Sequence, residues 1–158
     1  MAASIIENGV YFIQNFSTGT VINLKDGSNN TRVQTAKKLE LDVATVSEEL
    51  WIITRNPNKQ DEYMIQNAGS GTYMDVLGGT VTNGSNIVGF KSTGDKSQGW
   101  LISRNVDNKT YVIANAVTGK HYVTLSGGDT SEGKNIQVYA GEGTSETDVG
   151  KLWLIVRA

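Results

Sequence analysis

The sequence predicts an all-β protein in which a single domain is built from three similar units. A pair of short sequence patterns recurs three times at nearly equal spacing, and 18 of the 158 residues are glycine while one is proline. Glycine provides the positive φ angles of tight turns, so this composition is typical of many short strands joined by turns. A chain of this length corresponds to one domain, which we expect to span residues 1–158.

The two recurring patterns mark the start and the end of each unit. The opening pattern, Tyr-x-Ile-x-Asn followed by a Ser/Thr-Gly pair, begins at Tyr11, Tyr63 and Tyr111. The closing pattern, Trp-x-Ile-x-Arg, begins at Trp51, Trp100 and Trp153, which are all the tryptophans of the chain. The units therefore span about residues 9–58, 59–107 and 108–158. We expect the recurring Tyr, Ile and Trp to form the core, and the recurring Asn and Gly to form turns.

The alternation of side chains within the units indicates short strands. In the second unit, Tyr63 and Ile65 and then Tyr73 and Asp75 alternate at period two between glycine-rich turns, which is typical of a hairpin. Twelve short strands, four in each unit, would close into a barrel with pseudo-threefold symmetry and leave no open sheet edge. A propeller would need four or more blades, so units of this length favour a β-trefoil.

Composition excludes several classes of function. Fourteen basic and sixteen acidic side chains give a net charge of −2, which argues against nucleic acid as a partner. The chain has no cysteine and one histidine, so disulfides, thiol nucleophiles and Cys- or His-rich metal sites are excluded. We expect neither a metal nor a cofactor.

The N-terminal sequence gives an expectation about location. It carries neither a basic leader nor an apolar stretch of about 7–15 residues, and no segment approaches ~18 consecutive apolar residues. We expect a cytoplasmic protein that does not insert into a membrane.

The second unit carries a pattern that points to function. Residues 73–76 read Tyr-Met-Asp-Val, residues 83–90 read Asn-Gly-Ser-Asn-Ile-Val-Gly-Phe, and residues 97–100 read Ser-Gln-Gly-Trp. They closely resemble the repeat of ricin B-type lectins, which reads Tyr-Leu-Asp-Val, Asn-Gly-x-x-Val-x-x-aromatic and then Asn-Gln-x-Trp, the QxW motif. The resemblance extends over all three units and is closest to mushroom lectins. It implies a β-trefoil agglutinin without enzymatic activity and, in a fungus, a role in defence.

The resemblance implies a role for each matching residue of the second unit. Asp75 would accept hydrogen bonds from sugar hydroxyls, because an ionised acceptor makes stronger bonds than a neutral one. Phe90 would stack on the apolar face of the sugar, and a backbone N–H near Gly78 would donate to it. Gln98 would hold Asp75 in place. Ser97 stands where the family has Asn, which we expect to weaken or retune the site.

The same resemblance suggests the ligand. Galactose-type sugars, with an axial 4-hydroxyl, present an apolar face that an aromatic ring can cover. The expected partners are therefore glycans containing galactose or N-acetylgalactosamine. Because single sugar sites bind weakly, useful avidity needs several sites, and a homodimer is the simplest way to provide them.

The third unit retains part of the pattern. Tyr139 falls at the stacking position and Gln137 two residues before it, while Thr124 replaces the aspartate and Lys151 the glutamine of QxW. His121 lies nearby and could add a donor. We take this unit as a second candidate site with weaker or different specificity.

The first unit has lost the pattern. Asn23 replaces the aspartate, Ala36 stands where the aromatic residue should be, and Glu49 replaces the glutamine. Without a stacking ring, we expect this unit not to bind sugar.

Other interpretations of these residues stay open at this point. Asp75 could merely cap a turn and Phe90 fill a gap under a loop, and His121 could be an ordinary strand residue. A protease inhibitor or another loop-mediated protein-binding module would place its function in a loop such as 37–45 or 141–150. A glycosidase would need two carboxylates about 5–9.5 Å apart across a cleft, and no unit offers an evident pair.

Overall fold

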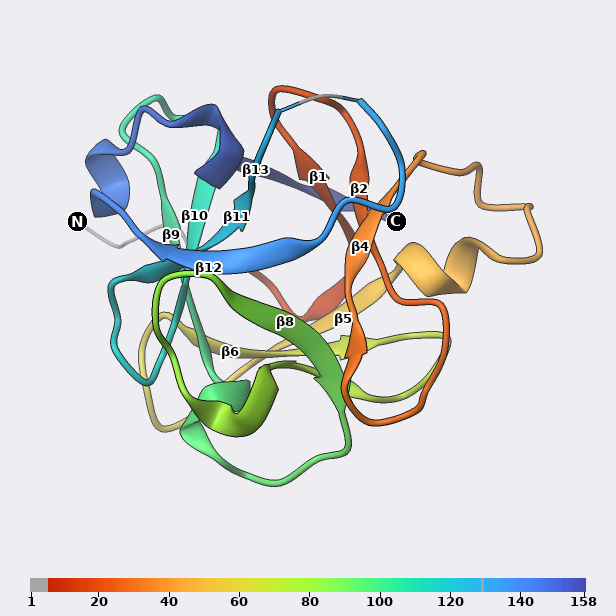
Figure 1. Cartoon of the computed structure of the whole chain (residues 1–158), viewed down its shortest axis with the longest axis horizontal. Helices are drawn as coiled ribbons and strands as arrows, with labels where there is room; N and C mark the ends of the chain where they lie inside the picture. Colours follow the sequence, from red (N-terminus) through yellow and green to blue (C-terminus); the bar gives the residue numbers. More distant parts are fainter. Residues whose placement is uncertain (1–5, 129) are drawn as a thin grey trace.

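The computed structural model describes residues 6–128 and 130–158, so the start of the chain, on which the expectation about a leader rests, lies largely outside it. Within the described residues it contains thirteen strands and five short 3-10 helices. The three units lie around a common centre (Figure 1). None of the described helices is long and apolar enough to cross a bilayer.

The elements follow the three units in order. The first unit contains β1 (Gly9–Asn15), β2 (Val21–Asn23), β3 (Thr31–Arg32), β4 (Gln34–Ala36), η1 (Val46–Glu49) and β5 (Trp51–Arg55). The second contains β6 (Glu62–Asn67), β7 (Tyr73–Val76), η2 (Leu77–Gly79), β8 (Ser85–Phe90), η3 (Lys96–Gln98) and β9 (Trp100–Arg104). The third contains β10 (Tyr111–Asn115), β11 (His121–Leu125), β12 (Ile136–Ala140), η4 (Gly143–Ser145), η5 (Val149–Lys151) and β13 (Trp153–Arg157).

The expected count of twelve strands is wrong by one, because the third strand of the first unit is interrupted at Val33. Before it, β3 pairs with β8 of the second unit, and after it β4 pairs with β2 of its own unit. The Val33 N–H donates to the Ile87 carbonyl, and the Thr35 N–H donates to the Lys134 carbonyl. This segment changes partners where the three units meet, so its ladder is broken into two short pieces.

Six strands close into a barrel, and the recurring patterns explain how. The closed order is β1–β5–β6–β9–β10–β13 and back to β1, with every pair antiparallel. Each opening Tyr pairs with a closing Arg; the pairs are Tyr11 with Arg157, Tyr63 with Arg55 and Tyr111 with Arg104. Outside the barrel, each unit contributes one pair of strands: β2 with β4, β7 with β8 and β11 with β12. Closure pairs the first strand of the chain with the last, so the six barrel strands have a neighbour on both sides.

The three tryptophans lie at the centre of the core, as the sequence predicts. Each side chain is fully buried, and each indole Nε1 donates to a carbonyl of the hairpin in its own unit. The acceptors are Ile22, Met74 and Val123, at 3.0, 2.9 and 3.0 Å. Each tryptophan thereby links the core to the strand that carries the candidate ligand-binding residue of its own unit.

The recurring Asn residues end a strand and organise the turn that follows it. Asn67 is buried, its Oδ1 accepts from the Ser70 N–H, and its Nδ2 donates to the Glu48 carbonyl. The positive φ of the turn belongs to the glycine four residues later, Gly71, at +78°. The Asn side chain thus contributes hydrogen bonds, while the glycine contributes the left-handed backbone.

Candidate functional site

The tryptophan hydrogen bonds identify equivalent positions in the three units. Asp75, Thr124 and Asn23 each directly follow the carbonyl that accepts from the indole. Their cross-strand partners are Val88, Gln137 and Gln34. Two residues beyond these partners lie Phe90, Tyr139 and Ala36. The structure therefore aligns the units in the register that the sequence motif gives.

The second-unit site is organised around the carboxylate of Asp75, which is 6% exposed. Its Oδ1 accepts from the Val76 N–H at 2.7 Å, and its Oδ2 accepts from Gln98 Nε2 at 3.1 Å. Each carboxylate oxygen can accept a further hydrogen bond. The carboxylate is fixed in orientation and still has acceptor capacity for a ligand.

Gln98 is held as firmly as the carboxylate that it orients. It lies in η3, and its Oε1 accepts from the Thr93 N–H at 3.0 Å. Its Nε2 also donates to the Lys91 carbonyl at 2.7 Å. These two backbone contacts determine which end of the amide faces Asp75, so the side chain presents a donor to the carboxylate.

The other predicted residues of the second unit lie on β8 and in the short helices η2 and η3. Phe90 is partly exposed at the end of β8, and it lies on the same face of the hairpin as Asp75 because side chains alternate along each strand. Gly78 is exposed in η2 with a φ of +70°, and a Cβ built there would meet nothing within 4 Å. Ser97 is 5% exposed, which is close to the exposure of Asp75.

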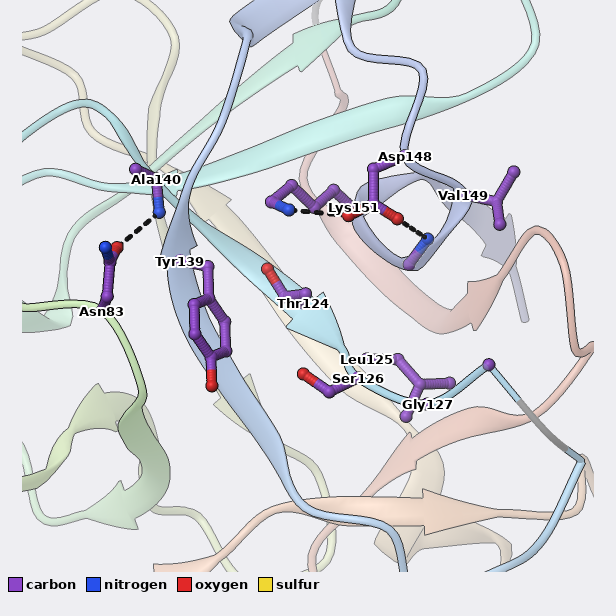
Figure 2. A pocket seen from close by; sticks show the side chains of 12 residues that line it. Asn83, Thr124, Leu125, Ser126, Gly127, Tyr139, Ala140, Asp148, Val149 and Lys151 are labelled. Carbon is purple, nitrogen blue, oxygen red and sulfur yellow. Dashed lines mark hydrogen bonds and ion pairs between the residues drawn. The ribbon is translucent and has the colours of Figure 1, made fainter.

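The third unit holds a cavity of about 430 Å³, within the ~300–1,000 Å³ range of small-molecule sites. Thr124 from β11 and Tyr139 from β12 line it, together with Asp148 and Lys151. Figure 2 shows the Tyr139 ring, the Thr124 hydroxyl and the Asp148–Lys151 ion pair around the same space. Lys151 Nζ lies 2.8 Å from Asp148 Oδ2.

Two of the four residues predicted for the third unit do not line this cavity. His121 shares the strand face of the core residue Val123 rather than that of Thr124, and its Nδ1 lies 2.8 Å from Thr118 Oγ1. Gln137 is the cross-strand partner of Thr124, but its Nε2 donates to Asn86 Oδ1 and to the Gly84 carbonyl. These contacts hold the amide nitrogen toward β8 and its preceding turn, while Gln137 Oε1 lies 3.5 Å from the Tyr139 hydroxyl.

Sequence reasoning missed Asp148, and it assigned Asn83 to the second-unit motif without indicating its place at the third unit. Asp148 lies five residues before Trp153, where the second unit has Asp95 before Trp100. Asn83 belongs to the second unit, but its Oδ1 accepts from the Ala140 N–H at 2.8 Å, which brings it to the rim of the third-unit cavity. A comparison of the residues before each Trp could have indicated Asp148, whereas the motif that begins at Asn83 gives no sign that this residue reaches the third unit.

The equivalent position in the first unit lacks the aromatic residue of the other two units. Asn23, Ala36 and Glu49 lie around a cavity of about 210 Å³ that has no aromatic ring in its lining. Glu49 is 1% exposed, and its Oε1 accepts from the Leu39 N–H at 2.9 Å. Burial raises the pKa of this carboxyl above its usual range, against the opposing effect of the Leu39 hydrogen bond.

The raised pKa of Glu49 predicts a pH-dependent effect on stability. The folded state holds the proton of Glu49 more tightly than the unfolded chain, so this group favours folding at acid pH and loses that contribution as pH rises through the folded-state pKa. Glu49→Gln can still accept from Leu39 without burying a charge. We expect it to raise the Tm at pH 7 by roughly 2–4 °C, with a smaller gain near about pH 4. Thermal unfolding at both pH values tests this, with the half-buried Glu48→Gln as control; an equal gain at both pH values would contradict it.

The arrangement offers hydrogen-bond acceptors and aromatic faces. Among the residues that the structure describes, no group of three or more His, Asp or Glu side chains is placed to hold a metal ion.

Comparison with known proteins gives the family. Residues 47–139, more than half of the chain, match the model of the ricin-type beta-trefoil lectin domain-like family. No curated protein matches the chain at a significant level.

Solved structures agree with this assignment. The Polyporus squamosus lectin, solved with the epitope Neu5Aca2-6Galb1-4GlcNAc, is 26% identical with a TM-score of 0.74; the match covers 96% of this chain and 50% of that one. The Macrolepiota procera ricin B-like lectin, solved with lactose, is 22% identical with a TM-score of 0.77, covering 98% and 99%. The Rhizoctonia solani agglutinin is 22% identical with a TM-score of 0.80, covering 99% and 100%. The threefold barrel and the matched family model together show that this chain belongs to the ricin-type β-trefoil lectin domain-like family.

Proposed function

We propose that this protein is a lectin without enzymatic activity that binds glycans containing galactose or N-acetylgalactosamine through its second unit. The observation that carries the proposal is the oriented carboxylate of Asp75, held by the Gln98 amide, with the ring of Phe90 on the same face of the hairpin. A fixed ionised acceptor beside an aromatic surface suits a sugar that presents adjacent hydroxyls and an apolar face.

The ligands of similar proteins support the choice of sugar. The Macrolepiota lectin was solved with lactose, and the Polyporus lectin with a sialylated epitope that contains Gal. Lactose also contains galactose, so galactose is common to both ligands. At this site, Asp75 would accept from two sugar hydroxyls and Phe90 would cover the apolar face.

Avidity is expected to come from more than one site. A shallow site with one carboxylate and one ring binds a single sugar weakly, and linked sites raise the apparent affinity without new contacts. A second site in the third unit, or a homodimer, would provide this multivalency.

A glycan array with the labelled protein, followed by competition with free galactose and lactose, tests the proposal. We expect selective binding to glycans containing galactose or N-acetylgalactosamine, and loss of that binding when free sugar competes. A blank array would overturn the proposal, and a protease panel would then examine the alternative of an inhibitor that acts through a loop such as 37–45.

A further inference from the structure

The third unit contains the same hydrogen-bond arrangement as the second, but around a carboxylate that comes from a different element. In the second unit, one oxygen of Asp75 accepts from a backbone N–H and the other accepts from the side chain two residues before the Trp. In the third unit, Asp148 Oδ1 accepts from the Gly150 N–H at 3.0 Å, and Asp148 Oδ2 accepts from Lys151 Nζ at 2.8 Å. Lys151 occupies the position of Gln98.

From this correspondence we propose that the third-unit cavity is a second saccharide site in which Asp148, held by Lys151, replaces the strand aspartate as the hydroxyl acceptor. The inference rests on the proposed lectin function and deepens it. It names an acceptor carboxylate that lies outside the sequence motif, on the 3-10 turn rather than on the strand.

Two differences from the second unit explain why Asp148 takes the place of the strand aspartate: Thr124 stands for Asp75, and Lys151 stands for Gln98. Thr124 is short and neutral, and its Oγ1 donates to the Tyr122 carbonyl at 2.7 Å, so it cannot act as the ionised acceptor. Lys151 is 9% exposed, and a buried ammonium group requires a charged partner. Asp148 satisfies that requirement from the N-cap of η5. The ion pair therefore brings a carboxylate to the cavity that Thr124 leaves open.

The remaining walls suit a sugar ring. Tyr139 is partly exposed and provides the aromatic surface at the position of Phe90. Gly127 and Gly128 line the cavity with φ angles of +90° and +56°, and a Cβ at either would meet nothing within 4 Å. Asn83 fixes the end of β12 through the Ala140 N–H. The cavity thus has an aromatic wall, a polar pair and a wall formed by the glycine backbone.

The charge of the pair indicates a neutral saccharide as the ligand. The ammonium and the carboxylate compensate each other, so neither attracts a charged sugar strongly. Each Asp148 oxygen keeps acceptor capacity, and Lys151 Nζ has further N–H groups to donate. Adjacent hydroxyls of one sugar can therefore meet an acceptor and a donor together, whereas the second unit offers them mainly an acceptor.

The hydrogen bond from Lys151 and that from the Gly150 N–H lower the pKa of Asp148, which keeps the acceptor ionised in mildly acidic solution.

The experiment measures third-unit binding by itself. In ¹⁵N-labelled protein carrying Asp75→Asn, which weakens the second unit, the amide signals of Gly127, Gly128 and Gly150 are followed during titration with galactose, N-acetylgalactosamine and lactose. We expect at least one sugar to shift them. Adding Asp148→Asn should weaken that binding at least tenfold. The matched control is Asp95→Asn, the equivalent position in the second unit, which should leave the third-unit affinity unchanged.

Two further variants address the possibility that Asp148→Asn unfolds the turn. Lys151→Gln keeps the carboxylate but removes its charged partner, and we expect weaker third-unit binding with the fold retained. Thr124→Asp combined with Lys151→Gln rebuilds the second-unit arrangement, and we expect it to restore binding in the Asp148→Asn background.

Each contrary outcome has a distinct meaning. If wild-type protein shifts the second-unit amides of Gly78 and Gly79 but no sugar shifts the third-unit amides, the second site is overturned while the lectin function stands. The second site is also overturned, and the lectin function still stands, if Asp148→Asn leaves the third-unit sugar affinity unchanged. If wild-type protein shows no shift in either unit, the proposed function itself fails.

Discussion

Asp75→Asn is expected to abolish measurable sugar binding at the second unit while leaving the fold intact. The substitution replaces an ionised acceptor by an amide, and hydrogen bonds to a charged group contribute ~1.5–3 kcal/mol each. The loss of two such bonds corresponds to a Kd weakened by roughly 100-fold or more. Calorimetry or amide-shift titration with lactose measures the effect.

The stability of this variant separates a binding role from a capping role. Asn can satisfy either the Val76 N–H or Gln98 Nε2 through its single oxygen, so we expect a stability loss of about 1 kcal/mol and a fall in Tm of roughly 2–4 °C. The exposed Asp95→Asn is the control, with neither property changed. A large loss of stability with unchanged sugar affinity would mean that Asp75 only caps the turn.

Trp100→Phe is expected to destabilise the fold strongly. Trp100 is fully buried, and its Nε1 donates to the Met74 carbonyl at 2.9 Å. Phenylalanine leaves that carbonyl without its partner and leaves a cavity beside it, which together cost roughly 2–4 kcal/mol. Thermal unfolding should show a fall in Tm of roughly 5–15 °C.

The same variant should also weaken sugar binding, because Met74 directly precedes Asp75 on β7. Trp51→Phe is the matched control, since Trp51 is equally buried but donates to Ile22 in the first unit. We expect Trp51→Phe to lower the Tm by a similar amount and to leave the second-unit affinity unchanged. If both variants lose the same second-unit affinity, the sugar site of a unit does not depend on the tryptophan of that unit in particular.

The recurring patterns were sufficient to predict the barrel. Each opening Tyr pairs with a closing Arg in the observed register, because both patterns are barrel strands with alternating buried side chains. The break at Val33 was not predictable, since it depends on hydrogen bonds from this segment to β8 and to Lys134, which belong to the other two units. The motif also aligned Thr124 and Tyr139 with Asp75 and Phe90, and both line the third-unit cavity. Gln137, aligned by the same motif, and His121, expected only from its nearness, do not line it.

The sequence by itself determined the threefold all-β fold, the register of the units and the position of the second-unit aspartate, because these follow from local alternation and from patterns repeated along the chain. Only the tertiary structure decided which side chains surround the third-unit cavity. Asp148 and Lys151 approach it from η5, and Asn83 comes from the preceding unit. Asn83 reaches the cavity because the pairing of β8 with β12 brings the second unit against the third, and Asp148 lies there because the buried ammonium group of Lys151, three residues later, needs a counter-charge.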